Sequence, residues 1–148
     1  MAIIIGSGAL FLGALDFSIN VNLPRFRSEL GETLISVQLI IIMYHGARSG
    51  TGFVAGGIAD RFGIKWPLVA GIVLYTVAVG LISLQDSLTP IVALRIPQGI
   101  GVAILFTLAP ALVARAFGPS RRGAALGVTL GAMGLGTFAG TLGGRSEE

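Results

Sequence analysis

Five long apolar runs, separated by short polar segments, dominate the hydrophobic pattern of this chain. A helix that crosses a bilayer needs about 20 mostly apolar residues, and each run reaches or approaches that length. Short connections make consecutive helices antiparallel. The pattern therefore predicts an all-α membrane protein whose five transmembrane helices form one partial transmembrane domain over residues 1–148. The predicted spans are residues 2–23, 34–59, 67–84, 90–117 and 124–143.

Composition supports the bilayer as the environment of the chain. Of its 148 residues 53% are hydrophobic and 11% are charged, against about 25% charged residues in soluble domains. The net charge of +3 comes from basic residues near the ends of the apolar runs, which argues against a nucleic-acid partner. With no cysteine, one histidine and no paired carboxylates beside a nucleophile, we expect neither a metal site nor an enzyme.

Basic residues at the span ends predict the orientation. One side of the membrane collects five of them and the other three, which favours a multi-pass protein of the cell (inner or plasma) membrane with a cytoplasmic N-terminus. The larger group is Arg61, Lys65, Arg115, Arg121 and Arg122, and the smaller group is Arg25, Arg27 and Arg145.

Two charged residues in the first and fourth spans lie at similar depths. Asp16 lies about 12 Å inside the boundary at Pro24, and Arg95 about 8 Å inside the boundary at Pro90. Intramembrane charges are costly and mark functional sites, so a contact between the two is a candidate proton switch. The alternatives are a structural aspartate held by a neighbouring helix and an arginine that snorkels to the interface.

The second span contains His45 and Arg48, three residues apart on one helix face. Arg48 lies about 22 Å from the outer end, too deep to snorkel easily. It is a candidate for lining a polar cavity and binding an anionic group; the alternatives are a pairing with a helix outside this sequence and a non-functional product. His45 is a candidate proton relay or makes one structural hydrogen bond.

The charged turn GGIADRFGIKWPL, residues 56–68, resembles a family signature. The signature is G-x-x-x-D-R-x-G-R-[KR], found between the second and third helices of major facilitator superfamily transporters. Ile64 stands where the signature has a basic residue. The resemblance implies that this loop is a conformational gate, in which Asp60 holds the inward side closed and Arg115 is its candidate partner. The matching residues are Gly56, Asp60, Arg61, Gly63 and Lys65.

Three further segments resemble helix signatures of the same superfamily. LDFSINVNLP, residues 15–24, is similar to the first-helix signature of drug–proton antiporters, and ALRIPQGIGVA, residues 93–103, to the fourth-helix signature R-x-x-Q-G-x-G-x-A. GLGTFAGTLGG, residues 134–144, loosely resembles the antiporter fifth-helix signature, with Thr137 in place of proline and Thr141 in place of glycine. Glycines spaced by four form two rows in the fifth span and predict close helix packing or a gating role: Gly123, Gly127 and Gly131 in the first row, and Gly136, Gly140 and Gly144 in the second.

The resemblance implies an alternating-access secondary transporter, a proton-coupled exporter of small molecules or drugs. Asp16, Arg95 and Gln98 would serve coupling and transport, with the proton gradient as energy source and no cofactor. Five spans make most of one six-helix half, so we expect a fragment whose partners are lipid, a small-molecule substrate and missing C-terminal helices. The rival interpretations are an inactive or regulatory truncated membrane fragment and a small homo-oligomeric transporter or channel.

Overall fold

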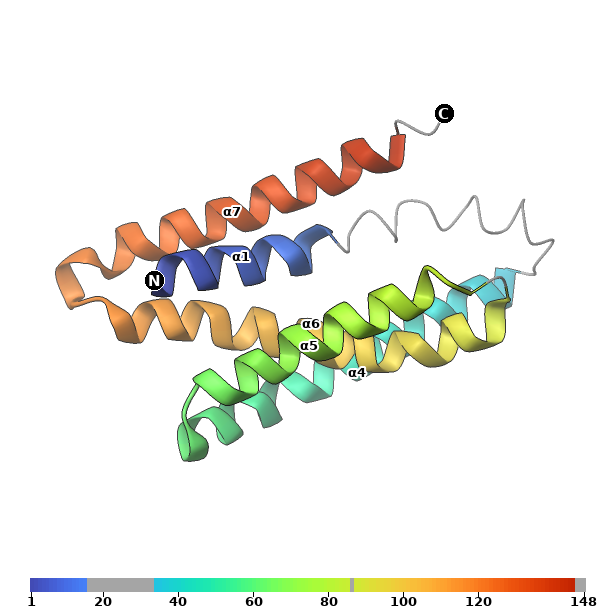
Figure 1. Ribbon diagram of the computed structural model, residues 1–148, viewed down its shortest axis with the longest axis horizontal. Helices are drawn as coiled ribbons and strands as arrows, with labels where there is room; N and C mark the ends of the chain where they lie inside the picture. The colour runs from blue at the N-terminus through green and yellow to red at the C-terminus, as the bar shows by residue number, and fades with distance from the viewer. Residues whose placement is uncertain (16–33, 86, 146–148) are drawn as a thin grey trace. The chain divides into compact units, whose positions relative to one another are not determined.

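The computed structural model describes residues 1–15, 34–85 and 87–145, and these residues are helical apart from short connections (Figure 1). No strand occurs within these ranges, so the all-α prediction is confirmed for the part of the chain that is described. The helices are α1 Ala2–Leu15, α4 Leu34–Phe62, α5 Lys65–Ile82, α6 Leu88–Ala116 and α7 Pro119–Arg145.

Three helices begin before the apolar runs that predicted them. They start at Lys65, Leu88 and Pro119, two to five residues earlier than the apolar pattern suggested. Backbone hydrogen bonding continues through polar residues at a membrane surface, whereas hydropathy marks only the apolar part of a helix. Proline suits the first position of α7, because the N–H it lacks would have no partner inside the helix. The remainder of the predicted first span, residues 16–23, lies outside the described residues.

The turn between α4 and α5 depends on one glycine. Gly63 has φ +86°, a left-handed conformation that costs glycine little and other residues much more. Its amide donates to the carbonyl of Ala59 over 3.0 Å, which closes the last turn of α4. The next residue, Ile64, is 7% exposed. A buried side chain at this position explains why an apolar residue replaces the basic residue of the resembled signature.

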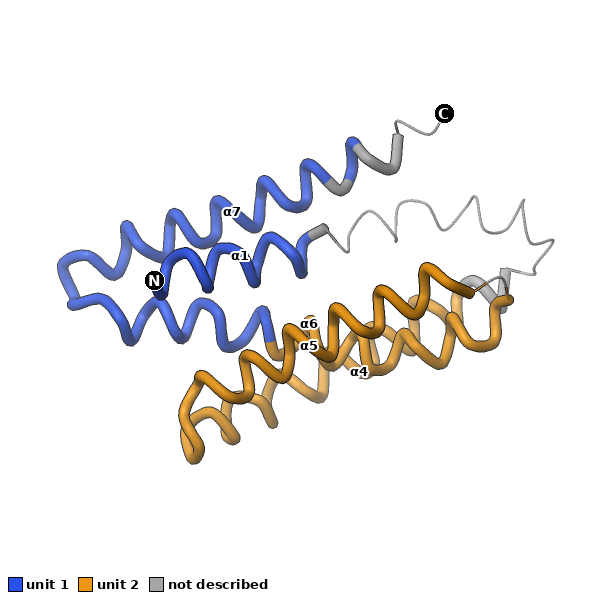
Figure 2. Tube along the Cα trace, viewed as in Figure 1, with its two compact units in different colours: residues 1–22, 105–148 blue, residues 23–104 orange. Residues whose placement is uncertain are grey.

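The chain divides into two compact units, and residues 23–104 form one of them (Figure 2). It contains α4, α5 and the first part of α6. Ile40 and Ile91 are buried against each other, and Ile82 packs on them. Further along, a Cβ placed on Gly101 would lie 2.8 Å from the backbone nitrogen of Tyr75. Because Ile82 pairs early on α6 and Tyr75 later, α5 and α6 run antiparallel.

Helices α4 and α6 cross closely at another glycine. A Cβ placed on Gly99 would lie 2.6 Å from the carbonyl oxygen of Tyr44 and 3.3 Å from the Cβ of Ala47. Since Ile40 meets Ile91 and Tyr44 meets Gly99, the two helices run parallel. A glycine of the fourth span thus makes the close helix contact that small residues allow in membrane proteins.

We expect Gly99→Ala to destabilise the protein by about 1–3 kcal/mol, because the new methyl group meets backbone that cannot rotate away. The measurement is the thermal unfolding midpoint of the purified protein in detergent. Gly80→Ala on α5 is the matched control, since no atom of the described residues lies within 4 Å of a Cβ there. Equal midpoints for the two variants would show that the α4–α6 crossing tolerates extra volume.

Residues 1–22 and 105–148 form the other unit. In it α1 lies between α7 and the C-terminal half of α6 (Figure 1). A Cβ on Gly6 would lie 2.7 Å from Val113 of α6, and a Cβ on Gly136 of α7 would lie 2.6 Å from the carbonyl oxygen of Phe11. Small residues thus let α1 approach both neighbours. The buried hydrophobic residues of this unit are Ala9, Leu10, Ala14, Leu105, Leu108, Ala109, Val113 and Ala125.

The first glycine row of α7 differs from the prediction. Nothing within the described part of the chain lies within 4 Å of a Cβ built on Gly123, Gly127 or Gly131, so the predicted close packing is not made there. Gly136, in the second predicted row, does make a close approach, so the prediction is confirmed at that position. Spacing alone identifies a row of small residues but not the helix that covers it.

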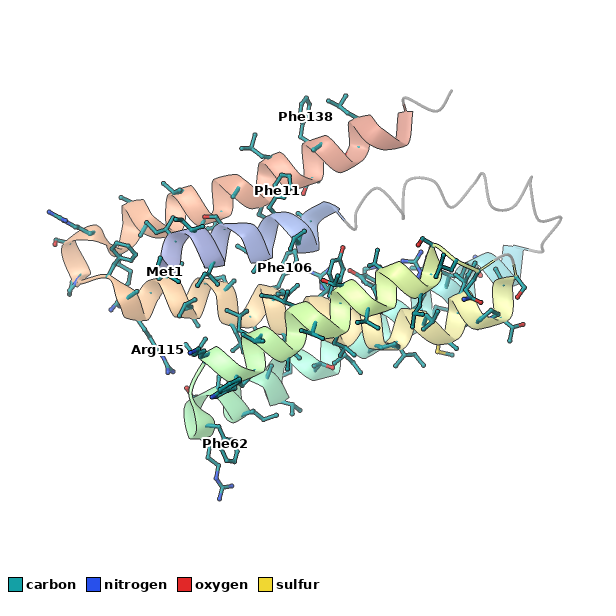
Figure 3. The ribbon with its side chains drawn as sticks, in the orientation of Figure 1. Met1, Phe11, Phe62, Phe106, Arg115 and Phe138 are labelled. Atoms are coloured by element: carbon teal, nitrogen blue, oxygen red, sulfur yellow. The ribbon has the colours of Figure 1, made fainter. Side chains whose placement is uncertain are left out.

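Apolar surface remains exposed on the helices. By length and composition α5 and α6 are, among the described helices, long and apolar enough to cross a bilayer, and α1 is a shorter apolar helix. Phe53 is 89% exposed, Trp66 71% and Phe138 63%, and Figure 3 shows Phe138 projecting away from α7. Large exposed apolar side chains of this kind suit contact with lipid.

Candidate functional site

A buried arginine–glutamine pair lies on one face of α6. Arg95 is 1% exposed and Gln98 0%, and Nη1 of Arg95 donates to Oε1 of Gln98 over 3.3 Å. Their spacing of three residues brings the side chains to the same face. Arg95 is therefore enclosed by protein. Its guanidinium does not snorkel to the membrane interface, which was the alternative considered from the sequence. A buried guanidinium in an apolar helix is expensive, so its retention points to a function.

The helix that crosses α6 beside this pair contributes a buried tyrosine. Tyr44 of α4 is 3% exposed, and its carbonyl oxygen faces Gly99, one helical turn beyond Arg95. Tyr75 of α5 is 7% exposed next to Gly101. Neither tyrosine was predicted from the sequence as a site residue. The available signal was a phenol hydroxyl within an apolar span, which needs a polar partner when buried.

His45 and Arg48 lie on α4 next to this crossing. His45 is exposed, and its ring meets that of Tyr44 edge to face at 5.0 Å between centroids. Arg48 is partly buried, and its backbone nitrogen lies 3.4 Å from a Cβ placed on Gly99. The fold thus brings Arg48 within about one helical turn of the level of Arg95. Their roles in lining a cavity stay predictions.

Asp16, the proposed proton carrier, lies outside the described residues. Its contact with Arg95 therefore stays a prediction. Among the residues that are described, no group of three or more histidine, cysteine, aspartate or glutamate side chains is arranged to hold a metal ion.

The charged turn after α4 lies at the surface of its unit. Asp60, Arg61 and Lys65 are exposed, and Gly56 is partly buried. The guanidinium of Arg61 lies 5.8 Å from the ring centroid of Phe62. In the same way Nζ of Lys65 lies 5.7 Å from the ring centroid of Trp66. Such cation–aromatic pairs suit a membrane interface, where both partners are partly solvated.

Arg115, the predicted partner of Asp60, is exposed near the end of α6 and extends away from that helix (Figure 3). The two residues belong to different units, so their pairing also stays a prediction.

Because the turn resembles the gate signature of transporters, we expect Asp60→Asn to lower transport about tenfold, which is what loss of one hydrogen bond to a charged group costs. Asp60 is exposed at the end of α4, so folding and membrane insertion should be unchanged. Transport is measured in vesicles, and insertion by quantifying the protein in washed membranes. Transport at the wild-type rate by Asp60→Asn would show that Asp60 is not part of the gate.

Comparison with known proteins supplies the context of these helices. The riboflavin transporter RibZ of Clostridioides difficile (strain 630) is 26% identical over 132 residues, covering 88% of this chain and 29% of RibZ. A putative multidrug resistance protein MdtD of Yersinia enterocolitica is 32% identical over 96 residues, covering 64% of this chain and 20% of that protein. The same-named protein of Yersinia pestis (strain Pestoides F) is 30% identical over 96 residues, 64% of this chain and 21% of its own length.

The chain thus spans less than a third of the length of these curated relatives. A family profile also matches, and it covers residues 5–145, nearly the whole sequence. Together with the apolar helices and the buried arginine of α6, this match shows that the chain belongs to the Major Facilitator Superfamily, whose members are membrane transporters.

Proposed function

We propose that the chain forms most of the N-terminal helical half of a secondary active transporter that exports small molecules in exchange for protons. Family membership supports a transporter. Relatives named as a riboflavin transporter and as putative multidrug resistance proteins favour small organic molecules as cargo. Because the chain spans a fraction of these relatives, the activity belongs to a longer assembly of helices.

The observation that carries the proposal is the buried Arg95–Gln98 pair. Gln98 accepts a hydrogen bond from Arg95 and orients the guanidinium. A fixed, buried positive charge attracts a carboxylate, and Asp16 lies at a similar predicted depth. A proton arriving on Asp16 removes its negative charge and releases it from Arg95. The transporter then has two states, with Asp16 bound to Arg95 or released from it, and one proton shifts the balance between them. Coupling of transport to the proton gradient requires such a shift.

The charged turn between α4 and α5 would control access to this switch. Gly63 sets the turn, and Asp60 with Arg115 would close the cytoplasmic side in one of the two states. The excess of basic residues on the side of this turn supports a cytoplasmic location for the turn and for the N-terminus, in a protein of the cell membrane. No cofactor takes part in the scheme, because the proton gradient supplies the energy.

The test uses the full-length protein in proteoliposomes with an acidic lumen and a fluorescent dye outside. Protein molecules that are inserted inside-out, with the cytoplasmic side facing the medium, should then accumulate dye in the lumen. Protons that leave the vesicle through the protein drive the dye inward. A protonophore should abolish the accumulation. Dye uptake that is unaffected by collapse of the pH gradient, or no uptake at all, would overturn proton-coupled export.

A further inference from the structure

The surface of α5 divides into two opposite faces. At 3.6 residues per turn, the buried residues of this helix fall on one side and the exposed apolar residues on the other. The buried residues are Leu68, Gly71, Tyr75 and Ala78. The exposed apolar residues are Trp66, Val69, Val73, Val77 and Leu81. One face of α5 therefore packs on protein, and the other presents an apolar stripe along the helix.

This stripe has the properties of a lipid-facing surface. Helix α5 is long and apolar enough to cross a bilayer, and the chain belongs to a family of membrane transporters. The stripe begins at Trp66 in the first turn of the helix and reaches Leu81 in the last. An exposed apolar stripe over the whole length of a spanning helix faces hydrocarbon. Trp66 therefore lies at the level where lipid chains give way to headgroups.

Two cations lie at the same end of the helix as this tryptophan. Arg61 is in the last turn of α4, and Lys65 is the first residue of α5. The reversal of the chain at Gly63 brings both to one end of the helix pair, and both are exposed. Asp60 carries the one negative charge of residues 56–68. The turn between α4 and α5 therefore keeps a net positive charge.

Each cation contacts the aromatic ring that follows it in the chain. The guanidinium of Arg61 lies 5.8 Å from the ring centroid of Phe62, and Nζ of Lys65 lies 5.7 Å from that of Trp66. Phe62 is 70% exposed and Trp66 71%, and Figure 3 shows Phe62 projecting from the end of α4. Within the described residues, these ring contacts are the interactions of the two cations. A ring attracts the charge but leaves N–H donors available for an anion.

A phospholipid with a net negative charge fits this combination of groups. Its phosphate accepts charge-assisted hydrogen bonds from a guanidinium and an ammonium group, and its acyl chains lie along the apolar stripe of α5. A zwitterionic headgroup fits less well, because its own cationic group is repelled by Arg61 and Lys65. An acidic protein would match the charges of the turn but not a stripe that is immersed in hydrocarbon.

We propose that the turn between α4 and α5 binds the headgroup of an anionic phospholipid, whose phosphate is held by Arg61 and Lys65. The rings of Phe62 and Trp66 then lie at the level of the glycerol backbone, where interfacial aromatic residues are usual. The inference goes beyond the proposed function, and it holds whether or not the protein couples transport to protons. The lipid is a bound partner of the turn and not the transported molecule.

Quenching of Trp66 fluorescence by brominated lipids tests the inference. The full-length protein is placed in vesicles of phosphatidylcholine that contain a minor fraction of brominated lipid, either phosphatidylglycerol or phosphatidylcholine. The signal of Trp66 is the difference between the native protein and the Trp66→Phe variant, because tryptophans elsewhere contribute equally to both. We expect brominated phosphatidylglycerol to quench this signal more strongly than brominated phosphatidylcholine at the same fraction.

Variants of the two cations identify the contact. Arg61→Gln and Lys65→Gln should each weaken the preference for phosphatidylglycerol about fivefold, the effect of one basic residue near an anionic surface. The double variant should weaken it about 25-fold if the two effects add. Lys65→Arg keeps the charge and should keep the preference. Arg121→Gln, the matched control, removes one positive charge from an exposed residue of α7 and should leave the preference at Trp66 unchanged.

Three outcomes would overturn the site. Equal quenching by the two lipids in the native protein would show that anionic headgroups are not preferred. A preference that persists in the double variant, or that Arg121→Gln weakens as much as Lys65→Gln does, would assign it to the general surface charge. If inorganic phosphate abolishes the preference and chloride at equal ionic strength does not, the turn binds a soluble anion instead of a lipid. Should the double variant fail to insert, Lys65→Gln alone decides by the same comparison.

Discussion

Asp16→Asn should abolish pH-gradient-driven transport while leaving substrate binding measurable. Asparagine has nearly the volume of aspartate, so the substitution opens no large void. It removes the one carboxyl group in the interior of the predicted spans, and with it the group that would bind and release the proton. A charge at this depth is costly enough that its retention indicates a function.

The measurement is dye accumulation in proteoliposomes with an acidic lumen, with a parallel binding titration. Substrate exchange between equal concentrations on the two sides, with no gradient, should survive in Asp16→Asn, because alternation no longer requires deprotonation. Asp16→Glu serves as the control that keeps the carboxyl group, and it should retain part of the coupled transport. Full gradient-driven transport by Asp16→Asn would end the proton-carrier assignment.

The helical architecture could be predicted from the sequence because a bilayer allows few alternatives. Each apolar run must satisfy its backbone hydrogen bonds internally, so each becomes a helix. The start of α7 at Pro119 was harder to predict. The first residues of this helix are polar, and hydropathy does not separate a polar helical turn from a loop.

The arginine–glutamine pair could also be predicted, since a spacing of three residues fixes the shared face of a helix. The residues that this pair packs against could not be predicted. The crossing of α4 and α6 at Gly99 depends on how two separate helices fit together, and a single sequence does not state which helices touch. The same limit explains why Tyr44 was missed and why the row at Gly123 was assigned a contact that the described residues do not make.

Arg95→Ala should reduce transport at least as much as Asp16→Asn. The side chain is 1% exposed, so its removal leaves a buried void and removes the hydrogen bond to Oε1 of Gln98. It also deprives Asp16 of the positive charge that would hold it ionised. Arg95→Lys separates these effects, because lysine keeps the charge but not the fork of donors. We expect partial transport from Arg95→Lys, and wild-type transport by Arg95→Ala would exclude a role in coupling.

The double variant decides whether the two residues act as a pair. If Asp16 and Arg95 form one switch, either single substitution already breaks it, so the second has little left to remove. The combined loss of transport, expressed as free energy, should then be smaller than the sum of the single losses by about 0.5–3 kcal/mol, the usual range for residues in contact. The four rates are compared in the same gradient-driven assay, with Gly80→Ala as a variant remote from the pair. Strictly additive losses would keep both residues in the transport cycle and remove their direct contact.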